Sequence, residues 1–172
     1  MDTNRQNVKK TLILLSHPAF DKSVANKALV EAIKGLPGVR VIDIYAAPFV
    51  PETYSRPVAE ASTLVFQFPF YWFSAPSQLK KWCDELFVKD AAKGKKLLVA
   101  TTTGSEYEAY RSGGRNRFTI DELLRPCQAL ANHSGMMWQT PFAVCGTNLP
   151  TAAQNIAAGA EAYRARILSL TE

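Results

Sequence analysis

The sequence predicts an α/β protein whose five-stranded parallel sheet, in strand order 2-1-3-4-5, lies between two layers of helices as a three-layer sandwich. Along its 172 residues, short aliphatic runs alternate with longer segments whose apolar residues keep helical spacing. This alternation is typical of parallel sheets built with helical crossovers. The composition, 47% hydrophobic, is sufficient for one core. We therefore expect a single domain over residues 1–172, with residues 1–9 as a flexible N-terminal extension.

The expected strands are short runs rich in aliphatic and β-branched residues. An aromatic run interrupts this pattern near the end of the third strand. It passes through Pro69, which cannot continue a central strand. The residues from Phe70 onward are therefore expected in a loop. The five predicted strands fall within residues 11–16, 39–45, 62–68, 95–103 and 137–145.

The expected helices begin at residues that suit a helix N-terminus. Pro126 interrupts one helical pattern and is expected to kink or restart that helix. The segment between the second and third strands, residues 46–61, is the least regular part of the chain. The candidate N-terminal residues are Ser23, Ser74 with Pro76, Thr119 with Glu122 in capping-box spacing, and Thr151.

Three loops follow the carboxyl ends of predicted strands, where doubly wound sheets bind their ligands. The first, "SHPAFDKSVAN", runs into a helix N-terminus, whose unpaired N–H groups suit a phosphate. The second, "FPFYWFSAP", presents aromatic rings that could stack on a flat ring or pack on a partner subunit. The third, "TTTGSEYEAY", joins a threonine cluster to Gly104, which permits close approach to a ligand edge. A capped helix, a packed hydrophobic loop and a flexible loop are the purely structural alternatives.

Several function classes lack their sequence signatures. The motifs GxSxG, GxxxxGK[ST] and GxGxxG are absent, so a hydrolase elbow, a P-loop and a dinucleotide-binding fingerprint have no support. Cys83, Cys127 and Cys145 lie far apart without metal-ligand spacing. We therefore expect reduced thiols in a cytoplasmic protein and no metal site. The net charge is +5, but the basic residues are dispersed, so no nucleic-acid partner is expected.

Taken together, these loops resemble those of the flavodoxin-like NAD(P)H:quinone oxidoreductases. The resemblance is strongest to the bacterial general-stress oxidoreductases and to the ancillary subunits of glutathione-gated potassium efflux systems. It covers well over half of the chain. The matching pieces are "LILLSHPAFDKSVANKAL", "VFQFPFYWFSAPSQLKKWCDELF", "LLVATTTGSEYEAY" and "NRFTIDELLRPCQALANHSGMMWQTPFAV".

The resemblance implies a flavodoxin-like fold, FMN as the cofactor with FAD as the alternative, and NAD(P)H as co-substrate. His17 and the turn before the first helix would hold the flavin phosphate and ribityl chain. The aromatic loop would line the isoalloxazine ring, and the threonine–glycine loop would lie along its other edge. Tyr110 would take the catalytic position. The implied cofactor-binding residues are His17, Ser23, Val24, Ala25, Asn26, Phe70, Tyr71, Trp72, Phe73, Thr102, Thr103, Gly104 and Ser105.

The resemblance also implies a ping-pong mechanism, in which a hydride passes from NAD(P)H to the flavin and a quinone then accepts two electrons in the same place. A homodimer is implied as well. Two features depart from the family pattern: Asn116 stands where mammalian relatives have a histidine, and the short segment 88–93 indicates a more open site. The alternative is a flavin-bound regulatory subunit on a membrane potassium transporter. A one-electron flavodoxin carrier is disfavoured because such carriers are typically acidic, whereas the pI here is about 9.2.

Overall fold

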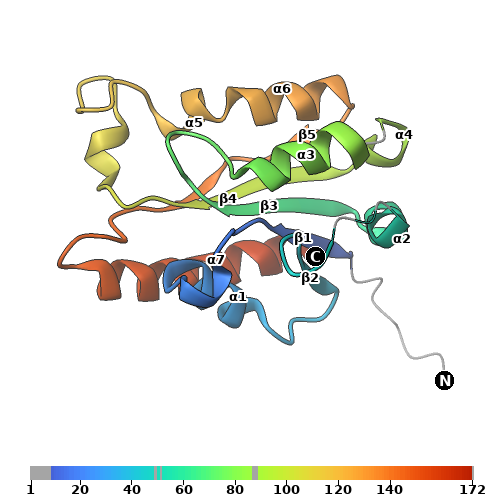
Figure 1. Cartoon of the computed structure of the whole chain (residues 1–172), viewed down its shortest axis with the longest axis horizontal. Coiled ribbons are helices and arrows are strands. Elements are labelled where there is room, and N and C mark those ends of the chain that lie inside the picture. Colours follow the sequence, from blue (N-terminus) through green and yellow to red (C-terminus); the bar gives the residue numbers. More distant parts are fainter. Residues whose placement is uncertain (1–8, 49, 51, 87–88, 172) are drawn as a thin grey trace.

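The computed structural model describes residues 9–48, 50, 52–86 and 89–171 (Figure 1). Its strands form one parallel sheet in the order β2-β1-β3-β4-β5, and β6 also pairs with β4. The predicted α/β class and strand order are confirmed. The predicted extension at residues 1–9 falls almost entirely outside the described residues. The strands are β1 (Thr11–Leu15), β2 (Val39–Asp43), β3 (Thr63–Pro69), β4 (Lys96–Thr102), β5 (Met137–Trp138) and β6 (Phe142–Val144).

The segment predicted to hold the fifth strand contains two short strands, β5 and β6. The Gln139 N–H still donates to Leu97 O at 2.9 Å, so the hydrogen bonding of β5 to β4 extends one residue past Trp138. Pro141 has no N–H with which to continue the ladder, and pairing resumes only at Phe142.

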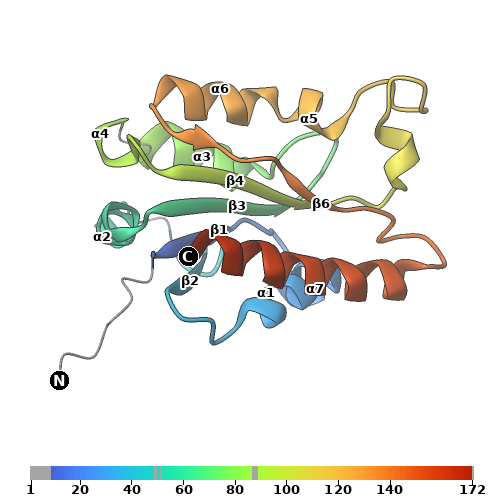
Figure 2. The same ribbon diagram turned by 180° about the vertical axis from the view of Figure 1, so that it is seen from behind.

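Two helical layers cover the sheet, as Figures 1 and 2 show. Helices α1 and α7 pack on one face, over a core that includes Leu29 and Tyr163. Helices α3, α5 and α6 cover the other face, over a core that includes Phe66 and Trp82. Within the described ranges, no helix is both long and apolar enough to cross a membrane. The helices are α1 (Ala25–Ile33), α2 (Glu52–Glu60), α3 (Ser77–Leu86), α4 (Lys89–Ala92), α5 (Ile120–Leu123), α6 (Arg125–His133), α7 (Ala152–Thr171) and the 3-10 helices η1 (Phe20–Lys22) and η2 (Tyr107–Tyr110).

Alternation along the central strand β3 sends neighbouring side chains to opposite faces of the sheet. Phe66 and Phe68 lie in the core beneath α3, whereas Val65 lies in the core beneath α1 and α7. Gln67 lies two residues after Val65, so its side chain points to the same face of the sheet, and it is fully buried. A buried amide in a central strand needs hydrogen-bond partners, and these must come from the α1–α7 side.

The segment between β2 and β3 is more regular than the sequence predicts, because it contains helix α2. Tyr54, Pro57 and Val58 are its buried residues. Pro57 lies inside the helix, where its missing N–H normally argues against helical structure. Burial of this apolar face outweighs that propensity. The segment 88–93, expected as a short loop, likewise contains α4, although Val88 lies outside the described residues.

Candidate functional site

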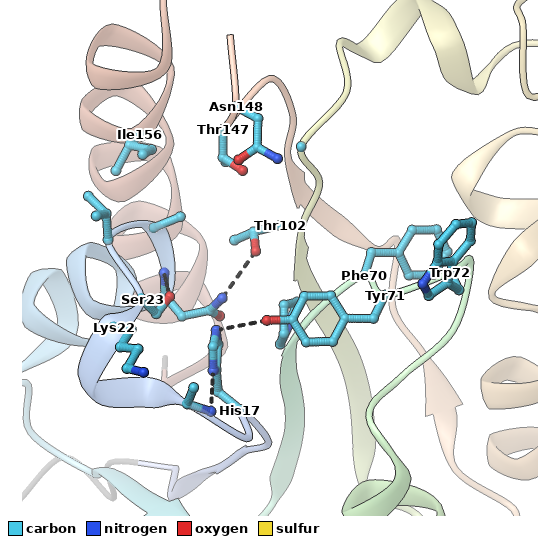
Figure 3. Close-up of a pocket in the computed structure, with 16 residues that line it drawn as sticks. His17, Lys22, Ser23, Phe70, Tyr71, Trp72, Thr102, Thr147, Asn148 and Ile156 are labelled. Atoms are coloured by element: carbon cyan, nitrogen blue, oxygen red, sulfur yellow. Dashed lines mark hydrogen bonds between the residues drawn. The ribbon is translucent and has the colours of Figure 1, made fainter.

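A cavity of about 620 Å³ opens where the carboxyl ends of β1, β3, β4 and β6 meet at one edge of the sheet (Figure 3). All three loops that the sequence singled out contribute to it. Most of the predicted cofactor-binding residues line it, whereas Phe73, Thr103 and Ser105 do not. The predicted catalytic residue Tyr110 does not line it either. The lining residues are His17, Ala19, Lys22, Ser23, Val24, Ala25, Asn26, Pro69, Phe70, Tyr71, Trp72, Thr102, Gly104, Thr147, Asn148 and Ile156.

The N-terminus of α1 forms one wall of the cavity. Ser23 Oγ accepts a hydrogen bond from Asn26 N–H at 3.2 Å, so Ser23 caps the first turn as the sequence predicted. Among the described residues, no acceptor is found for the N–H groups of Val24 and Ala25. These donors and the positive end of the helix dipole create a site for an anion beside Lys22.

His17 lies between this helix terminus and the aromatic wall, as Figure 3 shows. Its Nδ1 accepts a hydrogen bond from Ala19 N–H at 3.1 Å, and its Nε2 lies 3.5 Å from Tyr71 OH. Nδ1 is therefore unprotonated, and Nε2 carries the proton of the neutral ring. Burial lowers the pKa of His17, and this effect outweighs the opposing influence of Asp43 and Asp21.

This geometry predicts that acid destabilises the ligand-free protein through His17. Its folded-state pKa lies below the ordinary 6.5, so the unfolded chain takes up the proton first and the free energy of unfolding falls as the pH drops below that value. We expect His17→Asn, whose Oδ1 can accept the same Ala19 N–H, to remove this part of the pH dependence. Denaturant titrations of both proteins between pH 5 and pH 8 measure the difference. Identical pH profiles would contradict this role.

The aromatic wall is built on a tight turn over residues 71–74, here called the aromatic turn. The Ser74 N–H donates to Tyr71 O at 3.0 Å, and the two central residues have positive φ, 47° at Trp72 and 66° at Phe73. This pattern defines a type I′ turn, which normally carries Asn and Gly at its centre. The turn leaves Trp72 92% exposed and also directs Phe73 partly into solvent.

The end of β4 supplies the third wall. Thr102 is buried, and Gly104 lies so close to Asn148 that an added Cβ would come within 2.5 Å of its Nδ2. Thr103 and Ser105 serve the loop itself, because Thr103 Oγ1 donates to Ser105 O at 2.8 Å. Arg115 Nη2 also donates to Ser105 Oγ at 2.6 Å. The glycine thus keeps the wall open while its neighbours fix the backbone.

Comparison with known proteins places these features in a family. A family model described as the flavodoxin-like fold matches residues 9–167. The chain belongs to this family. General stress protein 14 of Bacillus subtilis is 38% identical over 157 residues, covering 83% of this chain and 89% of that protein. The uncharacterized NAD(P)H oxidoreductase YdeQ of Bacillus subtilis is 36% identical over 173 residues, with 94% and 87% covered.

Further relatives carry related names. The ancillary protein KefG of a glutathione-regulated potassium-efflux system, from Yersinia enterocolitica, is 34% identical over 147 residues, covering 78% of this chain and 80% of that protein. A crystal structure of general stress protein 14 from Treponema denticola in complex with FMN matches with a TM-score of 0.87 and 28% identity, covering 94% and 99%. An NADPH-quinone reductase from P. pentosaceus matches with a TM-score of 0.78 and 29% identity, covering 90% and 97%.

In this flavodoxin-like chain, Tyr110 lies behind the cavity wall. Its ring packs against Phe70 with centroids 6.1 Å apart, and only 6% of the residue is exposed. Asn116, which is expected at the position of a histidine in mammalian relatives, donates its N–H to Ala109 O at 3.1 Å. Tyr110 thus contacts a residue of the cavity wall without lining the cavity itself, and a catalytic role for Tyr110 stays a prediction.

Sequence reasoning missed one of the loops around the cavity. Thr147 and Asn148 follow β6, and Thr147 N–H donates to Thr103 O at 3.0 Å. Because ligands bind beyond the carboxyl ends of parallel strands, the end of the fifth predicted strand carried the same signal as the other loops. Lys22 and Ile156 also line the cavity and were not predicted to do so. Of the two, only Lys22 could have been found from the sequence, because it lies in the loop before α1.

The three cysteines do not contribute to the cavity. All are free and half-buried. Burial raises the pKa of Cys83 to about 12 and that of Cys127 to about 11. These thiols are therefore protonated and weakly nucleophilic near neutral pH. Over the part of the chain that the structure describes, no group of three His, Cys, Asp or Glu side chains is arranged to hold a metal ion.

Proposed function

We propose that this protein is an FMN-dependent NAD(P)H oxidoreductase that transfers two electrons to quinones or related acceptors. The observation that carries the proposal is the cavity itself, which combines an anion-binding helix terminus with an aromatic wall at the carboxyl edge of a flavodoxin-like sheet. The names of the relatives support it, because they include NAD(P)H oxidoreductases, an NADPH-quinone reductase and an FMN complex.

The residues of the cavity fit FMN. The N–H groups of Val24 and Ala25, with Lys22 beside them, suit its phosphate. Phe70 and Trp72 offer flat apolar surfaces for its ring system. Among the described residues, no acceptor is found for Gly104 N–H, which is free to bond a ring edge. FAD stays the alternative, since the cavity alone does not set the size of the ligand.

When bound, FMN would accept a hydride from NAD(P)H and pass two electrons to the acceptor in a ping-pong cycle. The chain would bind and orient both substrates over the aromatic turn. The Nε2–H of the neutral His17 ring would orient the Tyr71 hydroxyl. Because Tyr71 is 47% exposed, this hydroxyl would be available to hydrogen-bond a substrate. We further infer that the protein acts in the cytoplasm as a single domain.

The visible spectrum of the purified protein tests this function. We expect the absorption bands of bound FMN, their bleaching by NADPH without air, and their return when a soluble quinone is added. Protein stripped of flavin and reconstituted with FMN provides the matched control. A protein that neither retains nor rebinds FMN, or whose bound flavin is not bleached by NADPH or NADH, would contradict the proposal.

We also propose that the protein forms a homodimer. Tyr71, Trp72 and Phe73 of the aromatic turn are 47%, 92% and 44% exposed, and a contiguous exposed aromatic surface is typical of interaction sites. A twofold axis would cover the same surface on both copies. Light scattering of the FMN-loaded protein at micromolar concentration should give twice the 19.0 kDa mass of the chain. A monomer mass would contradict a dimer.

The Tyr110 hydroxyl is the remaining candidate for catalysis. We expect Tyr110→Phe to keep FMN bound, because the ring still packs against Phe70. Turnover should fall about 10-fold, equal to about 1.4 kcal/mol of transition-state stabilisation, if the hydroxyl supports developing charge. Stopped-flow measurement of flavin reduction and of reoxidation by a quinone identifies the affected step. Wild-type rates in both steps would remove Tyr110 from the mechanism.

A regulatory subunit of a potassium transporter is the second candidate function, and the similarity to KefG favours it. In this reading the flavin-loaded protein would associate peripherally with a membrane protein, and its enzyme activity would be secondary. Co-purification with a membrane potassium transporter supports this candidate. Full quinone reductase activity without any such association supports the NAD(P)H oxidoreductase function instead.

A further inference from the structure

A buried chain of hydrogen bonds runs from α7 to the floor of the cavity. The Tyr163 hydroxyl donates to Gln67 Oε1 at 3.0 Å, and both residues are fully buried. Gln67 Nε2 donates to Asn26 Oδ1 and to Asn26 O, each at 3.3 Å. Asn26 Nδ2 donates in turn to Thr102 Oγ1 at 3.0 Å, a bond drawn in Figure 3. The chain thus joins residues from four separate elements.

One atom fixes the direction of every bond in this chain. A backbone carbonyl oxygen can only accept, so Asn26 O requires the amide nitrogen of Gln67 to face it. Gln67 Oε1 then faces Tyr163, whose hydroxyl must be the donor. The second proton of Gln67 Nε2 goes to Asn26 Oδ1, which turns Asn26 Nδ2 toward Thr102. Every side-chain amide therefore has one permitted orientation.

The consequence appears at Thr102. Its Oγ1 must accept from Asn26, so its own proton points elsewhere. Among the described residues, no acceptor is found for this proton. Thr102 lines the cavity, so this O–H is available to a ligand bound there. The bond from Asn26 occupies one acceptor site of this hydroxyl and leaves its proton available to donate to a ligand.

We propose that Tyr163 and Gln67 are positioning residues that hold the Thr102 hydroxyl as a hydrogen-bond donor to FMN. This inference rests on the proposed function, because it takes FMN as the ligand. A fully satisfied polar network in a core fixes the orientation of its members, whereas a broken one leaves buried groups unpaired. Tyr163 reaches Thr102 only through Gln67 and Asn26, so its effect on the ligand must pass through them.

FMN titration of the apoprotein tests the proposal. We expect Thr102→Val to raise the dissociation constant about 10-fold, as for loss of one hydrogen bond. Thr102→Ser, which keeps the hydroxyl, should stay near the wild-type value. Tyr163→Phe should raise the constant about 3- to 5-fold, since the Gln67 amide loses the donor that completes its bonding. The double variant should match Thr102→Val alone, because both changes act on one donor.

Phe142→Leu is the matched control. The Phe142 ring lies 5.2 Å from that of Tyr163 and takes no part in the chain. The control should therefore lower the melting temperature without changing the FMN dissociation constant. In ¹⁵N-labelled protein without ligand, the side-chain amide signals of Asn26 and Gln67 should move in Tyr163→Phe and stay in place in Phe142→Leu.

The outcomes are distinct. If the wild-type protein binds no FMN, both the proposed function and the assignment of the Thr102 donor to FMN are contradicted. If the wild-type protein binds FMN and Tyr163→Phe binds it equally tightly, only the present inference falls. Additive effects of Tyr163→Phe and Thr102→Val would also overturn it, since they would show that the two residues act independently.

Discussion

The double substitution Trp72→Asn/Phe73→Gly is expected to stabilise the ligand-free protein while weakening FMN binding about 100-fold. Both residues hold left-handed backbone conformations, which cost residues with a Cβ roughly 1–2 kcal/mol each. Asn and Gly suit the centre of a type I′ turn, so the free energy of unfolding should rise by about 1–2 kcal/mol. The lost affinity follows from removing Trp72 from the cavity wall.

The single substitutions separate these two effects. Phe73→Gly relieves one strained residue that does not line the cavity, so it should raise stability and leave the FMN dissociation constant nearly unchanged. Trp72→Asn should account for most of the lost affinity. Denaturant unfolding of the apoproteins and FMN titrations measure the two quantities. A large loss of affinity in Phe73→Gly would instead support the sequence expectation that Phe73 lines the flavin ring.

The positive φ angles of Trp72 and Phe73 lower the stability of the ligand-free protein, and a role of the aromatic turn in ligand binding would explain why they are present. Residues in sparsely populated backbone conformations persist where the surrounding structure holds them, and they concentrate at ligand sites. Pro69 ends β3, and the next residue, Phe70, joins the strand to the turn and donates its N–H to Thr102 O at 2.9 Å. The turn is therefore held in place by the end of the sheet. If Trp72 stacks on the ligand, the cost of its conformation is offset only in the loaded protein.

The sequence predicted the fold where local chemistry and tertiary structure agree. The capping box at Thr119 and Glu122 is present in both of its hydrogen bonds. The predicted restart of the helix at Pro126 is also present, because α5 ends at Leu123 and α6 begins at Arg125, with Pro126 in its first turn. Prediction failed where packing outweighed a local signal. Pro57 lies inside helix α2, where burial of the apolar face outweighed its low helix propensity. The fifth predicted strand is the opposite case, because Pro141 interrupts its pairing with β4.

The candidate site was predictable as a set of loops but not as a set of contacts. The rule that ligands bind at the carboxyl edge of a parallel sheet located the walls of the cavity. The role of Asn26 was not visible, because its side chain faces inward to Gln67 and Thr102 rather than outward to an anion. The partner of Gln67 lies 96 residues away at Tyr163, and no local pattern in the sequence reports such a contact.

Gly104→Val is expected to raise the FMN dissociation constant about 10- to 100-fold, equal to about 1.4–2.7 kcal/mol. A Cβ at this position would lie 2.5 Å from Asn148 Nδ2, and both residues line the cavity. The Asn148 side chain is exposed and can move aside. The folded state should therefore lose little stability, while the added side chain narrows the cavity and the displaced amide no longer sits in its wall.

Gly113→Val provides the matched control for this substitution. Gly113 lies in the same loop region after β4, and an added Cβ would meet nothing within 4 Å. It should reproduce any effect of replacing glycine by a β-branched residue without narrowing the cavity. FMN titrations and thermal unfolding of both variants make the comparison. If Gly104→Val folds normally and binds FMN as tightly as Gly113→Val does, the ligand does not approach Gly104, and the third wall of the cavity is not part of the flavin site.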